Sequence, residues 1–152
     1  MIVAHIISSL RETFPARASE WGLTACVFSW GMTLSATPTL LDNALYFKAM
    51  ASILSQEKWM LICFTISISR FIALAINGLW RRTPHVRAFL AFISALFWFE
   101  ISLGLFQATP ISTGAGVYAV LFCMEVFNVF RAMGDAGRLD AVHKAASNGN
   151  NY

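Results

Sequence analysis

The sequence predicts an all-α fold: an integral membrane bundle of four transmembrane helices, with interfacial helices at the N-terminus and in the first loop. Two observations predict this class. Of the 152 residues, 57% are hydrophobic and 12% are charged, whereas a soluble domain carries about 25% charged residues. The apolar residues also gather into stretches long enough to cross a bilayer. The length fits one transmembrane helical domain, which we predict over residues 1–146, followed by a disordered tail over 147–152.

The N-terminal segment, residues 1–10, is apolar but too short to cross a membrane. Ile2, Ile6 and Leu10 recur at helical spacing, which favours a helix lying on the membrane surface. Pro15 would end this helix. A mobile tail is the alternative interpretation of the same residues.

The first predicted span covers residues 21–37 and ends before Pro38. It is short and only moderately apolar, so a re-entrant or interfacial segment is the alternative. Small side chains recur along it every three or four residues, which places them on one face where a neighbouring backbone can approach closely. We predict that this face packs against another helix; its members are Gly22, Cys26, Ser29, Thr33 and Ala36.

Residues 39–56 are too polar to span and have one apolar side, which favours a helix lying at the opposite membrane surface. The second span, residues 59–80, is the clearest one. At about 1.5 Å per residue it is long enough to cross a hydrocarbon core of about 30 Å. The third and fourth spans follow at residues 86–106 and 114–130.

The distribution of Lys and Arg predicts the orientation. They occur before the first span, between the second and third spans and after the fourth. The connection between the first and second spans has Lys48 and Lys58, offset by Asp42 and Glu57, and the connection between the third and fourth spans contains neither Lys nor Arg. Because Lys and Arg gather in cytoplasmic loops, both termini are expected in the cytoplasm.

Arg70 lies near the middle of the second span, where an unpaired guanidinium costs at least a few kcal/mol. Side chains lean toward the N-terminus of their helix, so Arg70 and Glu100 on neighbouring antiparallel helices would converge. We predict an Arg70–Glu100 ion pair, with Glu125 as the second choice or a third member. Asn77 lies one heptad after Arg70, and we expect a second polar layer of Asn77, Glu125 and Asn128.

Two interpretations of this buried polar network remain open. In the first interpretation, the network fixes how the helices pack, because apolar contacts discriminate poorly between helices inside lipid. Alternatively, it forms an ion or proton path or lines a pore, since ionisable residues inside a membrane often mark such sites.

Signals for other functions are weak. The cysteines fall in three different apolar segments without a CxxC motif, and the histidines lie far apart. No Ser-His-Asp, Cys-His or HExxH arrangement is present, and no basic run is interleaved with aromatic residues. We therefore expect no enzymatic activity, no cofactor, no metal site and no nucleic-acid partner.

One ordered set of residues resembles a known family. It comprises RFIALAING from Arg70, RTPHVR from Arg82, Trp98, STG from Ser112, Tyr118, Glu125, Arg131 and Asp135. The set resembles small four-span membrane proteins of tailed phages and prophages, over roughly residues 21–140. The resemblance implies a phage-related origin and a place in the bacterial inner (cytoplasmic) membrane. It brings no established activity and no catalytic residues.

These observations predict a non-enzymatic inner-membrane protein that acts by helix association or oligomerisation, in a holin-like or host-membrane-modifying role. Its expected partner is the lipid bilayer, and a homo-oligomer or an unidentified protein partner stays open. The alternative is a small ion channel or proton-coupled transporter that uses Arg70, Glu100 and Glu125. Four-span multidrug exporters carry their essential glutamate in the first span, and residues 21–37 contain none, which counts against this alternative.

Overall fold

The protein is described by a computed structural model that covers residue 14 and residues 17–43, 45–76, 83–108 and 110–149. The described residues are almost entirely helical and contain no strand. The elements, in chain order, are α2 (Ala18–Ala36), α3 (Leu40–Asn43), the 3-10 helix η2 (Leu45–Phe47), α4 (Lys48–Ile53), α5 (Gln56–Ala75), α6 (Thr83–Gln107) and α7 (Gly114–Gly149).

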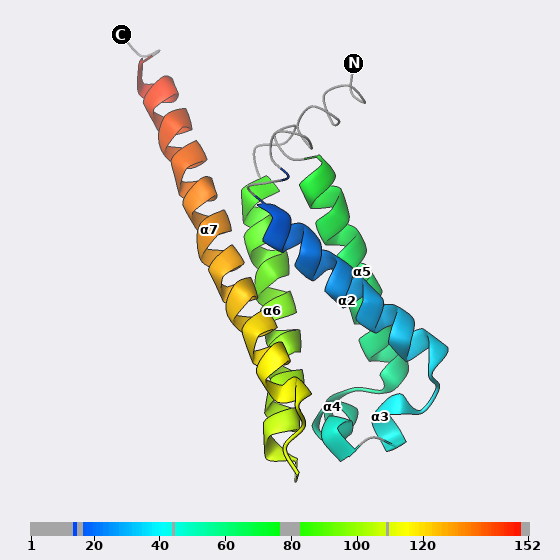
Figure 1. The fold of residues 1–152 in the computed structure, drawn as a ribbon. Helices are drawn as coiled ribbons and strands as arrows, with labels where there is room; N and C mark the ends of the chain where they lie inside the picture. Colours follow the sequence, from blue (N-terminus) through cyan, green and yellow to red (C-terminus); the bar gives the residue numbers. More distant parts are fainter. Residues whose placement is uncertain (1–13, 15–16, 44, 77–82, 109, 150–152) are drawn as a thin grey trace.

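The four long helices run alternately up and down (Figure 1). The start of α2 and the end of α7 lie at the same end of the molecule, and the short helices α3 and α4 lie at the other. The largest helix contacts are those of α6 with α7 and of α2 with α5. The contact between α5 and α6 is much smaller, although these helices are consecutive in the chain.

Within the described part of the chain, three helices are long and apolar enough to cross a membrane, at Gln56–Ala75, Thr83–Gln107 and Gly114–Ser147. The predicted all-helical class is confirmed for the described residues, and three of their helices are candidate membrane spans by length and composition. Helix α2, which contains the first predicted span, is not among the three. Residues 39–56, predicted as one helix, form α3, η2 and α4 instead, with a positive φ at Thr39.

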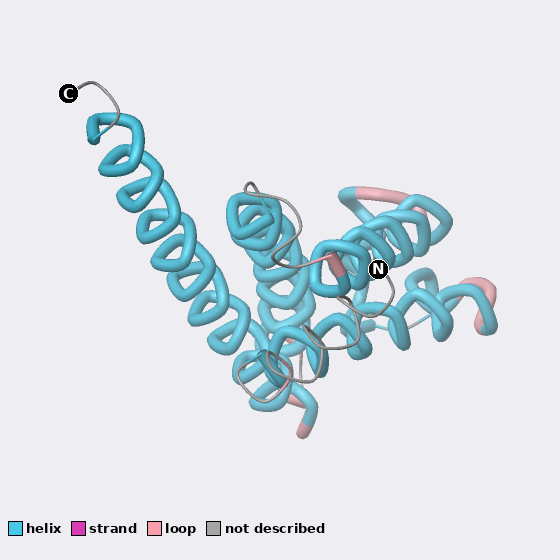
Figure 2. The backbone as a smooth tube through the Cα atoms, turned by 90° about the horizontal axis from the view of Figure 1, so that it is seen from above, coloured by secondary structure: helices cyan, strands magenta, loops and turns pink. Residues whose placement is uncertain are grey.

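Helix α7 is much longer than the fourth predicted span. It continues through Gly149, so the first residues of the predicted disordered tail are helical. Seen from above, its C-terminal half projects away from the other helices (Figure 2), and residues 137–147 are exposed. The predicted interfacial helix at residues 1–10 and the last residues of the tail lie outside the described residues.

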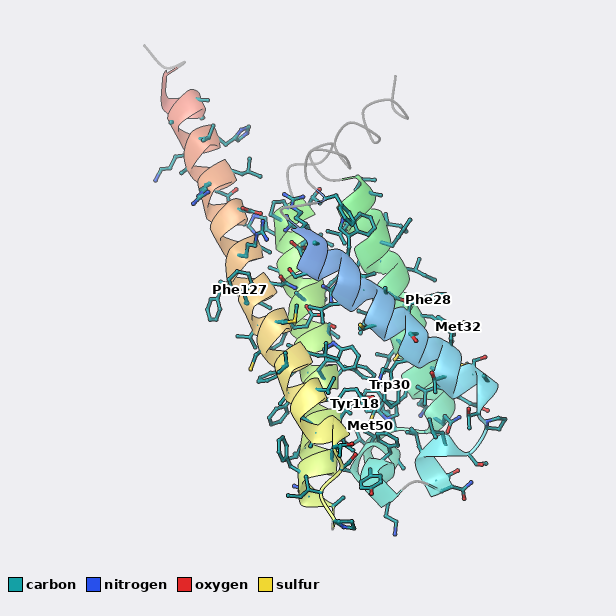
Figure 3. All side chains as sticks on the ribbon, in the orientation of Figure 1. Phe28, Trp30, Met32, Met50, Tyr118 and Phe127 are labelled. Carbon is teal, nitrogen blue, oxygen red and sulfur yellow. The ribbon has the colours of Figure 1, made fainter. Side chains whose placement is uncertain are left out.

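Aromatic side chains fill the half of the bundle nearer α3 and α4. The Trp98 ring stacks on that of Tyr118 with centroids 5.8 Å apart, and Trp30 meets Tyr118 edge-on at 5.9 Å. The Trp59 indole donates to the Met50 carbonyl oxygen at 2.9 Å, which ties α5 to α4. Trp30, Met50 and Tyr118 lie together in this half (Figure 3). The large rings therefore fill the space between the helices in this half of the bundle.

Gly104 on α6 allows η2 to approach closely. A Cβ at this position would lie 2.5 Å from the backbone oxygen of Tyr46. Because the atom that it meets belongs to the backbone, no side-chain rotation could relieve the clash. We predict that Gly104→Ala lowers the free energy of unfolding by about 1–3 kcal/mol, as overpacking does. Thermal unfolding in detergent, followed by circular dichroism, measures the change.

Gly134→Ala is the matched control, because a Cβ there meets nothing within 4 Å. This substitution should leave stability unchanged or raise it by up to about 1 kcal/mol, since alanine favours a helix interior. Equal destabilisation by both substitutions would contradict the close packing of η2 on α6.

Candidate functional site: two buried charge clusters

The inner cluster joins three helices through one carboxylate oxygen. Arg70 on α5 donates from Nη1 to Glu125 Oε1 on α7, and Ser94 Oγ on α6 donates to the same oxygen at 2.5 Å. The side chains of Arg70 and Glu125 are 4% and 0% exposed. Because both charges are buried, each depends on the other for its stability.

The predicted Arg70–Glu100 pair is wrong: Glu125, the second choice, is the partner of Arg70. Glu100 is half-buried on α6 and makes no ion pair with any described residue. The physical reason is helix pairing. Helix α6 packs mainly along α7 and touches α5 little. Glu100 also lies six positions after Ser94, about 120° around the helix, so it is on a different face.

Asn128 extends the inner cluster toward the end of the bundle where α2 begins. It lies one turn after Glu125 on α7, is fully buried, and accepts a hydrogen bond from Ser19 Oγ at 2.9 Å. The predicted layer of Asn77, Glu125 and Asn128 is therefore found for its two α7 members. Asn77 lies outside the described residues.

The outer cluster consists of Arg17, Glu20, Arg87 and Asp135. Arg87 on α6 forms two hydrogen bonds with the Glu20 carboxylate on α2, from Nη2 and, at 2.9 Å, from Nε. Its Nη1 donates to Asp135 Oδ2 on α7 at 3.3 Å, and Arg17 Nη2 lies 3.8 Å from the same oxygen. A two-pronged guanidinium–carboxylate contact fixes orientation as well as distance, so this cluster sets how α2 meets α6.

Sequence reasoning missed the outer cluster. The sequence prediction assigns no acidic partner to Arg17 or Arg87, and the predicted first span begins one residue after Glu20. Helix α2 begins at Ala18, so Glu20 lies in its first turn and is buried. The available signal was an acid at the start of an apolar helix in a chain with only 8 acidic residues.

The small-residue face of α2 points outward. Gly22, Ser29, Thr33 and Ala36 are exposed and Cys26 is half-buried. The residues that pack α2 into the bundle are on another side of the helix: Leu23, Thr24, Val27, Gly31 and Leu34. Within one chain, the predicted packing face therefore does not face α5. Larger apolar side chains on another side of α2 bury more surface against α5.

The inner cluster keeps unused hydrogen-bonding groups. Among the described residues, Arg70 Nη2, Glu125 Oε2 and Asn128 Nδ2 are buried without a partner. Such groups are rare in folded proteins because each costs about 1–3 kcal/mol. No group of His, Cys, Asp and Glu side chains in the described part of the chain is arranged to hold a metal ion.

No protein-family model, curated protein or solved structure matches the chain. The function is therefore inferred from the geometry of the two clusters and from the exposed surface.

Glu125→Gln tests the pairing in the inner cluster. It leaves the buried Arg70 guanidinium without a counter-ion, so we predict a loss of about 3–5 kcal/mol in the free energy of unfolding. Glu100→Gln is the matched control and should cost less than about 1 kcal/mol, because Glu100 is half-buried and unpaired among the described residues. Unfolding in detergent, followed by circular dichroism, measures both. A larger loss of stability in Glu100→Gln than in Glu125→Gln would contradict the Arg70–Glu125 pair and indicate that Glu100 is the partner of Arg70.

Proposed function

We propose that the chain is a non-enzymatic, multi-pass protein of the bacterial inner membrane that acts through helix association, both within the chain and between copies. The observation that supports this most is the pairing of buried charges between helices. Arg70 pairs with Glu125, and Arg87 pairs with Glu20, each across two helices. Buried charges that are paired and oriented toward each other favour a fixed arrangement of the helices.

The exposed surface supports contact with lipid. On α7 the buried residues include Glu125, Asn128 and Ala132, whereas Phe127 and Phe130 are exposed. Phe127 points away from the bundle (Figure 3), and on α2 Met32 is exposed while Phe28 is partly exposed beside Phe64 of α5. Polar groups inside and large apolar groups outside are the arrangement expected of a membrane helix, since lipid covers the apolar face.

Helix α2 would provide the fourth crossing. Its 19 residues extend about 28 Å, and it lies along α5. Four antiparallel crossings put the start of α2 and the end of α7 on one side, and the Lys and Arg distribution assigns that side to the cytoplasm.

The outward small-residue face supports association between copies. Gly22, Ser29, Thr33 and Ala36 are exposed on α2, and such faces allow two helices to approach closely in lipid. Assembly through this face fits a holin-like or host-membrane-modifying role, in line with the resemblance to phage membrane proteins.

A proton-coupled transporter or small channel is the second candidate. It is favoured by a line of polar groups between Asp135 and Glu125. Arg87 bonds Asp135 and Glu20, and Ser19, next to Glu20 in the chain, bonds Asn128, which lies one turn from Glu125 on α7. Between Asp135 and Glu125 this line extends about 15 Å along α7. The unpartnered Glu125 Oε2 at its inner end could exchange a proton. Glu20 also supplies the acid in α2 that the predicted first span lacked.

Induced expression in bacteria tests the leading proposal. We predict growth arrest, entry of a membrane-impermeant dye and cross-linked dimers or larger species in membranes. Gly22→Leu should reduce the cross-linked species at least several-fold, because its side chain blocks close helix approach. Gly116→Leu is the matched control, since a Cβ at either glycine meets nothing within 4 Å.

Equal cross-linking in wild type and Gly22→Leu would contradict assembly through α2. A harmless protein that, in proteoliposomes, carries flux along a pH gradient would favour transport instead, provided that Glu125→Gln abolishes the flux.

A further inference from the structure

The outer cluster and its surroundings carry an excess of positive charge. Both oxygens of Glu20 are used by Arg87, and Asp135 Oδ2 is shared between Arg87 and Arg17. Arg131 lies one turn before Asp135 on α7 and forms no ion pair with another described residue. Among the described residues, three arginines thus lie near two carboxylates, so these carboxylates leave one positive charge unbalanced.

Arg17 is the least satisfied member. Within the part of the chain that the structure describes, its only ion pair is the 3.8 Å contact with Asp135, and its Nη1 is buried without a hydrogen-bond partner. Burial lowers the pKa of Arg17, and the positive charges of Arg87 and Arg131 lower it further, against the raising effect of Glu20 and Asp135. A guanidinium in this situation is stabilised by an additional anion. Its side chain is 15% exposed, so an anion can reach it from outside the bundle.

The position of Arg17 along the bundle indicates the level of lipid headgroups. Trp21, one turn into α2, is half-buried, and tryptophan favours the membrane–water interface. On α7, Phe127 and Phe130 are exposed just before Arg131, whereas Arg138 and Lys144 are exposed beyond it. From the level of Arg131 onward, exposed charged side chains therefore join the exposed apolar ones on α7, among them Met133 and Val142.

We propose that Arg17, together with Arg131, binds the phosphate of an anionic phospholipid headgroup between the start of α2 and helix α7. Basic pockets between transmembrane helices on the cytoplasmic side are typical sites for such headgroups. This inference requires the helices to cross a bilayer, as proposed above, but it does not require association between copies.

The test uses the full chain in nanodiscs made from equal amounts of phosphatidylglycerol and phosphatidylcholine. Native mass spectrometry then counts the lipids that remain bound after release. We predict about fivefold enrichment of phosphatidylglycerol, the factor expected from one basic side chain near the surface. Arg17→Gln should reduce the enrichment to less than twofold, and Arg17→Lys should keep most of it because the charge remains.

Arg138→Gln is the matched control. It removes the same charge from the exposed part of α7, so it should leave the enrichment within twofold of wild type. Equal losses in Arg17→Gln and Arg138→Gln would show a general surface potential and overturn the site. Displacement of the bound lipid by soluble inorganic phosphate would assign the site to a free anion, which also contradicts the proposal. Protein that enters nanodiscs without lipid preference refutes this site alone, whereas failure to enter them refutes the membrane function.

Discussion

The arrangement of the helices depends on which acidic residue pairs with Arg70. A guanidinium in the middle of an apolar helix cannot face lipid without a cost of several kcal/mol, and it cannot lie inside the bundle without a counter-ion. Glu125 supplies that counter-ion from α7, and Ser94 on α6 hydrogen-bonds the same oxygen. One contact therefore sets the rotation of three helices about their own axes, because each must turn its polar residue inward.

Helix α7 connects the inner and outer clusters. Glu125, Asn128 and Asp135 lie along the side of this helix that meets the other three. Glu125 bonds to α5 and α6, Asn128 to α2 and Asp135 to α6. Small residues, Ala132 and Ala136, occupy the remaining buried positions on that side. In a bilayer, apolar contact discriminates poorly between helix faces, so this polar and small-residue side gives α7 its orientation. The aromatic half of the bundle fills the remaining interior with Trp98, Tyr118 and Trp30.

Much of the fold was predictable from the sequence, because helix length and apolar content report directly on local structure. The second, third and fourth predicted spans each overlap a described helix that is long and apolar enough to cross a membrane. Residues 77–80 of the second span lie outside the described residues, and α7 continues beyond the fourth span. The need of Arg70 for a buried acid was also predictable, since it follows from charge and depth alone.

The identity of that acid was not predictable, because it depends on which helices pack together. A short loop suggested that α5 and α6 are close neighbours, yet α6 lies mainly along α7. Glu20 was missed because hydropathy placed the helix start after it, whereas its pairing with Arg87 lets the helix begin earlier. The small-residue face on α2 was identified correctly as a stripe, but the direction in which it points depends on packing with α5.

The most direct test of this account is a solid-state NMR measurement of the protein in lipid bilayers, with ¹⁵N-labelled arginine and ¹³C-labelled glutamate. Dipolar recoupling reports pairs of arginine Nη and glutamate Cδ atoms within about 4 Å, the reach of an ion pair. The account predicts a contact that disappears in Arg70→Gln and in Glu125→Gln but persists in Glu100→Gln. Loss of the Arg70 contact in Glu100→Gln, or no Arg70 contact in the wild type, would contradict it.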